Sequence, residues 1–438
     1  MALDHVSTAF HARRPRRRRP PAPAVPAGAA GFVPALEGMR ALAATAVMLT
    51  HIAFQTGQVN DTVAGRVWGR FDMAVAVFFG LSGFLLWRAH ARAAWTDAPA
   101  PSAARYYRSR LVRILPAYLV VVVVVLAVLP EARGASPSTW LANLTLTQVF
   151  VPFSLTEGLT QMWSLSVEMQ FYLLVPLVAV LLAGLRGPRA RLRVPLLMAA
   201  ALVSGSWAWL GAGLHLARGV NYMNWIPGYV PWFVAGLALA ELAVAPTDRY
   251  VRIRRFAARR WLCWAAAALT FAVIATPLGG PVTLDTPARW QFATRMLLGG
   301  VLGFLLLAPL VLPPSARPGG RRWRLLDSGP MQALGRWSYG VFIWHLVILS
   351  SVFPLFGIMP FHGRMGYVAV LTVVFAAAVS AVSYSWVEEP FRAALARWEA
   401  ARRPDSPRRD PPSDPPPSDP VTGSTDQAST AIPASANP

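Results

Sequence analysis

Ten apolar runs constrain this chain more than any other feature of its sequence. They lie at 32–54, 71–87, 114–130, 163–185, 194–216, 229–245, 261–278, 296–312, 337–353 and 365–387. A helix needs about 20 predominantly apolar residues to cross the hydrocarbon core of a bilayer. The runs therefore predict an all-α fold, a polytopic membrane helix bundle of about ten transmembrane helices. A shorter apolar stretch at 140–153 contains Asn, Thr and Gln and is expected to be interfacial or re-entrant.

The basic residues alternate from one loop to the next along these ten spans. The chain has 41 basic residues, all arginine, and a net charge of +21. Of these, 33 fall in the two termini and in every second loop, seven fall in the other loops, and Arg40 lies inside a span. Because arginine-rich segments stay on the cytoplasmic side, we expect a multi-pass protein of the cytoplasmic membrane with both termini inside the cell. This placement argues against a nucleic-acid surface.

Composition divides the chain into three parts. Residues 1–30 are rich in Arg and Pro, residues 31–394 contain all the spans, and residues 395–438 are rich in Pro, Ser and Asp. Polar, Pro-rich segments cannot bury enough apolar surface to fold, so both tails are expected to be disordered and cytoplasmic. The absence of lysine excludes a lysine nucleophile or base, and the single cysteine, Cys263, excludes an intrachain disulfide and a Cys-rich metal site. We expect no metal.

The first span, "EGMRALAATAVMLTH", carries three residues that are costly in lipid. Glu37, Arg40 and His51 are separated by three and eleven residues, so all three share one helix face. A charged side chain at the bilayer centre costs about 2.5–3.5 kcal/mol on insertion scales, and such residues are usually functional. The spacing indicates the wall of a path for a long polar molecule. The alternative is a structural Glu–Arg pair beside a hydrogen-bonded histidine.

Two further stretches lie near the arginine-rich side. In "FFGLSGFLL", Ser82 and Gly83 interrupt an aromatic span, and small residues there also favour close helix packing. In "RSRLVRILPAY", Arg110 and Arg113 are three apart and share a helix face, where paired guanidinium groups suit a phosphate. Topology anchoring or binding of anionic lipid heads explains the same arginines equally well.

Three later spans contain polar pairs at helical spacing. Ser164 and Glu168 lie four apart in "WSLSVEMQFY", and His51 is the partner expected for this carboxylate because both lie in the outer half. Ser338 and His345 lie seven apart in "GRWSYGVFIWH", where a core histidine bonded to a backbone carbonyl is the alternative to a functional one. In "SYSWVEEPF", Glu388 precedes Glu389 and Pro390, a pattern that favours a solvated helix end.

These six stretches, in this order, resemble the acyltransferase 3 family of integral membrane acyltransferases, over about 32–394. The family pattern opens with an acidic residue, Gly, one residue and Arg, followed by ten residues and His, here Glu37, Gly38, Arg40 and His51. The resemblance implies transfer of an acyl group, usually acetyl from acetyl-CoA. The acceptor implied is a hydroxyl of a cell-envelope carbohydrate or of a glycosylated or macrolide natural product. Some members carry an extra extracytoplasmic hydrolase-like domain, which we do not expect here, so the membrane bundle must perform the whole transfer.

The residues fit that chemistry. Arg110 and Arg113 would hold the phosphates of an acyl-CoA, which acts as a co-substrate and not as a bound cofactor, and Arg40 would line the path of its arm. His51 would be the general base and Glu168 its orienting partner. The supporting residues expected around them are Glu37, Ser82, Ser164, Ser338, His345 and Glu388. A transporter or exporter that uses the same buried charges as a proton relay is the alternative function.

Overall fold

A computed structural model gives the fold of residues 33–96, 98–246, 248–313 and 323–402. Fifteen α-helices and several short 3-10 turns make up these residues, and no strand is present among them. The helices are α1 (Pro34–Gln55), α2 (Val63–Arg70), α3 (Ala74–Trp95), α4 (Ala103–Val128), α5 (Pro137–Leu144), α6 (Trp163–Leu181), α7 (Arg193–Ser204), α8 (Trp207–Leu210), α9 (Ile226–Val244), α10 (Val251–Ala258), α11 (Arg260–Ala275), α12 (Arg289–Val311), α13 (Gly329–Leu355), α14 (Met365–Ser383) and α15 (Glu389–Ala401). The all-α fold is confirmed.

Membrane-spanning length and composition are found in eight helical stretches of the described residues. They run Val63–Trp95, Ala103–Val128, Thr160–Leu181, Gly187–Gly213, Tyr222–Val244, Arg289–Val311, Gly329–Leu355 and Met365–Ala401. The pair Val251–Ala258 and Arg260–Ala275, bent by 87°, makes a ninth if it is counted as one span. The chain is therefore a multi-pass membrane bundle with eight or nine spans by these criteria, against about ten predicted.

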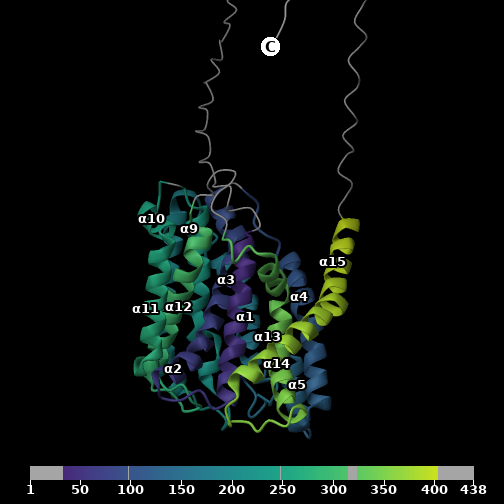
Figure 1. Ribbon diagram of the computed structural model, residues 1–438. Coiled ribbons are helices and arrows are strands. Elements are labelled where there is room, and N and C mark those ends of the chain that lie inside the picture. Colours follow the sequence, from purple (N-terminus) through teal and green to yellow (C-terminus); the bar gives the residue numbers. More distant parts are fainter. Residues whose placement is uncertain (1–32, 97, 247, 314–322, 403–438) are drawn as a thin grey trace, which may run out of the picture. The chain divides into compact units, whose positions relative to one another are not determined.

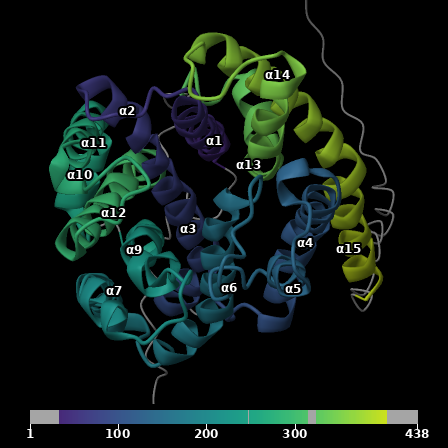
Figure 2. The ribbon, with the colours of Figure 1, turned by 90° about the horizontal axis from the view of Figure 1, so that it is seen from below.

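The remaining predicted span, 32–54, is the 22-residue helix α1, which is long enough but less apolar than the others. Glu37, Arg40 and His51 lower its apolar character. Proline at its first position fixes a helical φ, and the carboxylate of Glu37 lies in its first turn, beside the positive end of the helix dipole. Figure 1 and Figure 2 show α1 inside the bundle, where other helices surround it. Its polar residues thus face protein.

Helix α3 is the other central element (Figure 2). It packs along α9 and also contacts α12 and α1, while α1 packs against α13 and α13 packs against α14. Glycines allow the closest of these approaches. A Cβ atom on Gly83 or Gly236 would overlap backbone atoms of the facing helix, so the prediction of close helix packing at Gly83 is confirmed.

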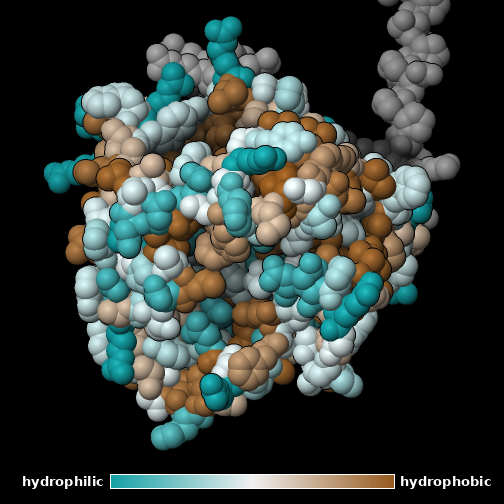
Figure 3. Space-filling view, turned by 60° about the horizontal axis from the view of Figure 1, so that its bottom comes forward, coloured by the Kyte–Doolittle hydropathy of each residue, from teal (hydrophilic) through white to brown (hydrophobic). Residues whose placement is uncertain are grey.

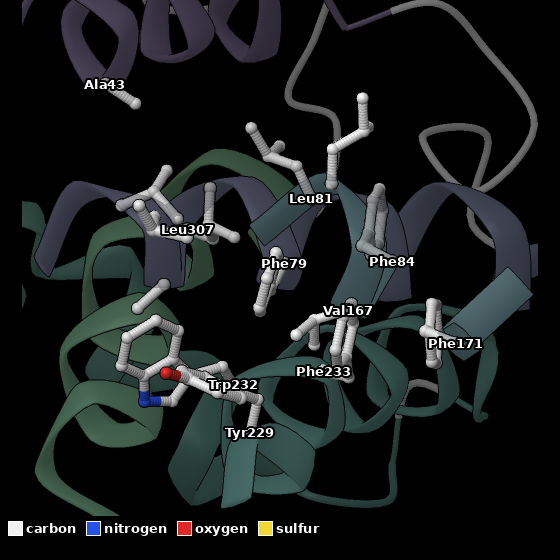
Figure 4. Packing of buried hydrophobic residues seen from close by; sticks show 14 of the residues in the cluster. Ala43, Phe79, Leu81, Phe84, Val167, Phe171, Tyr229, Trp232, Phe233 and Leu307 are labelled. Atoms are coloured by element: carbon white, nitrogen blue, oxygen red, sulfur yellow. The ribbon is translucent and has the colours of Figure 1, made fainter. Parts of the chain in front are cut away.

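Aromatic side chains fill the core between α3, α6 and α9. The ring of Phe233 stacks on Phe79 with centroids 4.3 Å apart and on Phe171 with centroids 4.0 Å apart. Tyr229 and Trp232 pack against the same Phe79 ring, and Figure 4 shows these side chains pointing toward one another. Offset aromatic pairs add roughly 0.5–1.5 kcal/mol each beyond the area that they bury. This packing fixes α6 beside α3.

The stretch at 140–153 forms part of the short helix α5, followed by turns, and does not span the bundle. Helices α2 and α5 lie at the same end of the bundle, at the bottom of Figure 1. Figure 3 brings this end forward and shows hydrophilic side chains scattered among hydrophobic ones.

The tails predicted to be disordered, 1–30 and 395–438, lie largely outside the described residues. The compact unit ends at Leu395, and residues 396–402 belong to a second unit. The first residues of the predicted C-terminal tail are helical and not disordered, because helix α15 continues to Ala401. Its last residues, "RAALARWEAA", are strong helix formers.

Candidate functional site

An inner cavity of about 80 Å³ collects polar side chains from five helices. Arg40 comes from α1, Ser82 from α3, Arg110 and Arg113 from α4, and Ser338 from α13; Ser164, Glu168 and Tyr172 come from α6. Three guanidinium groups thus line one small space together with one carboxylate. The fold thus brings Arg40 of α1 together with Arg110 and Arg113 of α4.

Arg40 pairs with Glu37 one turn earlier on α1. Its Nη1 lies 3.7 Å from Glu37 Oε1, as their three-residue spacing predicts. Arg40 also interacts electrostatically with Arg113 and with Glu168 across the cavity. The Glu37 carboxylate therefore offsets part of the positive charge at this cavity.

Glu168 is held by two hydroxyl groups. Ser82 Oγ donates to Glu168 Oε1, and Tyr172 Oη donates to the same oxygen at 2.6 Å. Among the described residues it makes no hydrogen bond to His51, so the pairing predicted between them is not formed. Helix α6 packs on α3, where Ser82 meets Glu168, whereas α1 packs on α13 as well as on α3, and His51 meets His345 of α13.

An outer cavity of about 420 Å³ contains His51. It shares Val75, Ser164 and Phe342 with the inner cavity, so the two adjoin along α1, α3, α6 and α13. The polar residues that line it beside His51 are Thr50, Gln55, Asp72, Glu157, Thr160, Gln161 and Ser164. Arg40 and His51 therefore lie in two adjoining cavities, about 16 Å apart along the α1 axis at 1.5 Å per residue.

His51 packs against a second histidine. The ring centroids of His51 and His345 are 5.2 Å apart, with planes tilted by 39°. His345 is 1% exposed, and its Nδ1 lies 2.7 Å from the Phe342 carbonyl oxygen and 3.1 Å from that of Val341. Because a ring nitrogen bonded to a carbonyl must donate, His345 carries its proton on Nδ1. The backbone-bonded histidine foreseen at this position is therefore present, and it lies directly beside His51.

Of the remaining predicted residues, Ser338 lines the inner cavity and Glu388 lies outside both cavities. Ser338 Oγ, in the inner cavity, is buried and has no hydrogen-bond partner among the described residues. Glu388 lines neither of the two cavities. It is 1% exposed and its Oε2 accepts a hydrogen bond from Arg392 at 3.0 Å, so the solvated helix end predicted for it is wrong. A π-helical turn over Tyr384–Glu388 precedes α15, and Glu388 is buried while Glu389 is exposed.

Several residues of these cavities were not foreseen. Tyr172 lies four residues after Glu168 in the same motif, a helical spacing that could have revealed it. Gln161 is 2% exposed and donates to the Ile343 carbonyl at 3.2 Å, while its Oε1 has no hydrogen-bond partner among the described residues. The Oδ1 atom of Asp72 is also buried without such a partner. No sequence signal pointed to Asp72, since it lies between two helices.

No group of three or more His, Cys, Asp or Glu side chains suited to a metal ion occurs among the described residues. The polar groups that line the two cavities are guanidinium, imidazole, carboxylate, amide and hydroxyl groups.

The match to a known family follows this geometry. The Acyl_transf_3 model, described as an acyltransferase domain, matches residues 33–386. The chain belongs to this acyltransferase family. The matched region contains every residue of the two cavities, and of the predicted site residues only Glu388 lies beyond it.

Curated relatives of this family match the chain at low identity. Peptidoglycan O-acetyltransferase OatA of Listeria monocytogenes is 24% identical over 384 residues, which cover 82% of this chain and 56% of the relative. Acyltransferase MdmB of Streptomyces mycarofaciens is 27% identical over 356 residues, which cover 76% of this chain and 82% of MdmB. O-acetyltransferase OatA of Staphylococcus aureus is 23% identical, with 82% of this chain and 57% of the relative covered. The chain thus spans little more than half the length of the two OatA proteins. No solved structure matches the chain significantly.

Proposed function

We propose that this protein is a membrane O-acyltransferase that moves an acyl group, in the first instance acetyl, from an acyl-CoA to a hydroxyl of a carbohydrate or of a glycosylated or macrolide natural product. The observation that carries the proposal is the pair of adjoining cavities, one lined by three arginines and the other by His51. The family match supports an acyl transfer, and the name of MdmB agrees with it. The names of the two OatA relatives support an oxygen acceptor, and that of the Listeria protein supports a peptidoglycan product.

The inner cavity suits the donor. Arg40, Arg110 and Arg113 provide cationic hydrogen-bond donors, and arginine binds phosphate groups in bidentate geometry. At about 80 Å³ the cavity holds only a few water molecules, so it takes the narrow thioester arm while the phosphates remain at its arginine-lined entrance.

The outer cavity suits the acceptor. Its carboxylate, amide and hydroxyl groups match the hydroxyl groups of a sugar, and at about 420 Å³ it lies within the range of small-molecule sites. His51 removes the proton from the attacking hydroxyl, whose oxygen bonds to the thioester carbonyl carbon. The carbon–sulfur bond breaks, CoA leaves as a thiolate, and the proton held by His51 is passed to that thiolate or to solvent.

The distribution of the arginines indicates how the chain is oriented in the membrane. The helix ends that border the arginine-rich loops would face the cytoplasm, with both termini inside the cell and in the cytoplasmic membrane. The donor would then enter from the cytoplasm, where Arg110 and Arg113 lie near the start of α4, and the acceptor would meet His51 in the outer half.

Release of free CoA from acetyl-CoA by the purified full chain tests this function. Candidate acceptors are envelope glycans, simple glycosides and a macrolide. Acceptor-stimulated release should disappear in His51→Ala and persist in His362→Ala, a matched control in an exposed turn. Release that survives in His51→Ala would remove His51 from the reaction. No release from any acyl-CoA, together with no donor binding, would favour the transporter alternative.

A further inference from the structure

A third cavity lies beside α1 and takes no part in the proposed reaction. Its volume is about 900 Å³, larger than either the inner or the outer cavity, and α1, α3, α11, α12 and residues 323–326 form its walls. Its α1 residues are Met39, Leu42, Ala43 and Ala46, which lie on a face next to that of Arg40 and His51. The cavity therefore borders the helix that carries both reactive groups.

The walls of this cavity are apolar apart from one end. Of its twenty lining residues only Arg260 and Arg324 are charged, and the others are Ala, Leu, Met, Phe, Trp or Val. Both arginines are exposed. Arg260 is the first residue of α11, and Arg324 lies two residues before Leu326, whose backbone contacts Gly38 near the start of α1. The two guanidinium groups thus sit at the arginine-rich end of the bundle.

Tryptophan side chains frame the charged end. The Arg260 guanidinium lies 5.2 Å from the centroid of the Trp323 ring, and the Trp323 and Trp264 rings are 5.0 Å apart. The Trp264 indole N–H is buried and has no hydrogen-bond partner among the described residues. Tryptophan and arginine gather where lipid head groups meet the hydrocarbon region. This end has the composition of a head-group site.

Two aromatic rings lie at the opposite end of the cavity. Phe71 and Phe271 both line the cavity and their centroids are 5.9 Å apart. From Arg260 to Phe271 α11 advances eleven residues, about 16 Å at 1.5 Å per residue. This is close to half of a hydrocarbon core of about 30 Å. The cavity is as deep as one leaflet.

We propose that this cavity binds one anionic phospholipid of the adjoining leaflet, with its head group on Arg260 and Arg324 and its acyl chains along α11 and α1. The charge at one end selects an anionic head group, and the apolar walls, with an α11 side about 16 Å long, fit acyl chains of one leaflet. The bound lipid supports α1 from the side next to Arg40 and His51. The inference depends on the membrane embedding of the chain and not on the acyl-transfer reaction.

Two variants test the site on the full chain purified in detergent. Arg260→Gln combined with Arg324→Gln removes the head-group charges, and Ala268→Trp fills the cavity from an exposed position on α11. Arg252→Gln combined with Arg255→Gln is the control, because it removes two exposed arginines from α10 that do not line the cavity. The probes are phosphatidylglycerol and phosphatidylcholine with identical chains, and the readouts are bound lipid by native mass spectrometry and the midpoint of thermal unfolding.

Phosphatidylglycerol is expected to bind roughly tenfold to thirtyfold more tightly than phosphatidylcholine and to raise the unfolding midpoint. The Arg260/Arg324 variant should lose this preference, Ala268→Trp should lose bound lipid, and the control should keep both. Equal binding of the two lipids, or an unchanged preference in the Arg260/Arg324 variant, would overturn the proposal. So would an equal rise in the midpoint with inorganic phosphate alone, since that would show an anion site with no role for the acyl chains.

Discussion

The inner and outer cavities share three lining residues, yet the polar groups around them differ. The inner one gathers the guanidinium groups of Arg40, Arg110 and Arg113 around a single carboxylate. The outer one, which has no arginine in its lining, presents an imidazole, two carboxylates, amides and hydroxyls. The inner lining suits an anion, and the outer lining suits a neutral polyhydroxylated molecule. Under the proposed function, the donor and the acceptor would therefore be recognised separately and would meet near Val75, Ser164 and Phe342, which line both cavities.

Replacing His51 is expected to have the largest effect on the reaction. His51→Gln keeps a polar side chain in the outer cavity but removes the base, so we expect kcat to fall about 10³-fold, within the range for general base catalysis. The KM for donor and acceptor should change little, because neither binding surface is lost. Steady-state kinetics of CoA release measures this, with His362→Gln as the control. A tenfold rise in donor KM with kcat preserved would move His51 out of the reaction.

Removing the inner charges should affect the donor alone. In Arg110→Gln with Arg113→Gln the donor loses two charge-assisted hydrogen bonds, and we expect donor KM to rise about 30- to 100-fold after allowing for solvent screening. Acceptor KM should stay within twofold of the native value. The double variant Arg252→Gln with Arg255→Gln controls for loss of basic charge on the same side of the bundle. Equal changes in both KM values would mean that the arginines maintain the fold and do not distinguish the two substrates.

Glu168 tests whether the two cavities act separately. It lines the inner cavity, whereas the sequence predicts that it orients His51, which lines the outer cavity. Glu168→Gln weakens the hydrogen bonds from Ser82 and Tyr172, so we expect kcat to fall about tenfold, the effect of about 1.4 kcal/mol in the barrier. The pH dependence of kcat/KM should match that of the native protein, since Glu168 does not contact His51. A pH profile displaced in Glu168→Gln and not in Tyr172→Phe would restore the original pairing.

The sequence predicted the spans well because apolarity over 20 residues is a property of one segment at a time. It predicted the Arg40–Glu37 pair for the same reason, since both residues lie on one helix. It did not predict which helices are neighbours. The sequence predicts His51 and Glu168 at a similar depth, but Glu168 lines the inner cavity beside Arg40 and His51 lines the outer cavity, so the expected pair is not formed. The burial of Glu388 also depends on a local feature, the π-helical turn before α15, that no periodicity reveals.

Asp72 offers the smallest and most specific test of the outer cavity. It lies between α2 and α3, and its Oδ1 is buried without a hydrogen-bond partner among the described residues, while Arg295 and Arg70 interact with its charge. Asp72→Asn keeps the shape and one acceptor oxygen but removes the charge. One hydrogen bond contributes about 0.5–1.5 kcal/mol, so acceptor KM should rise roughly twofold to tenfold with donor KM unchanged. Asp61→Asn, in an exposed pair with Arg66, is the matched control. A change in donor KM instead would show that the two cavities act as one site. A charge in the outer cavity would then affect binding of the ligand in the inner cavity.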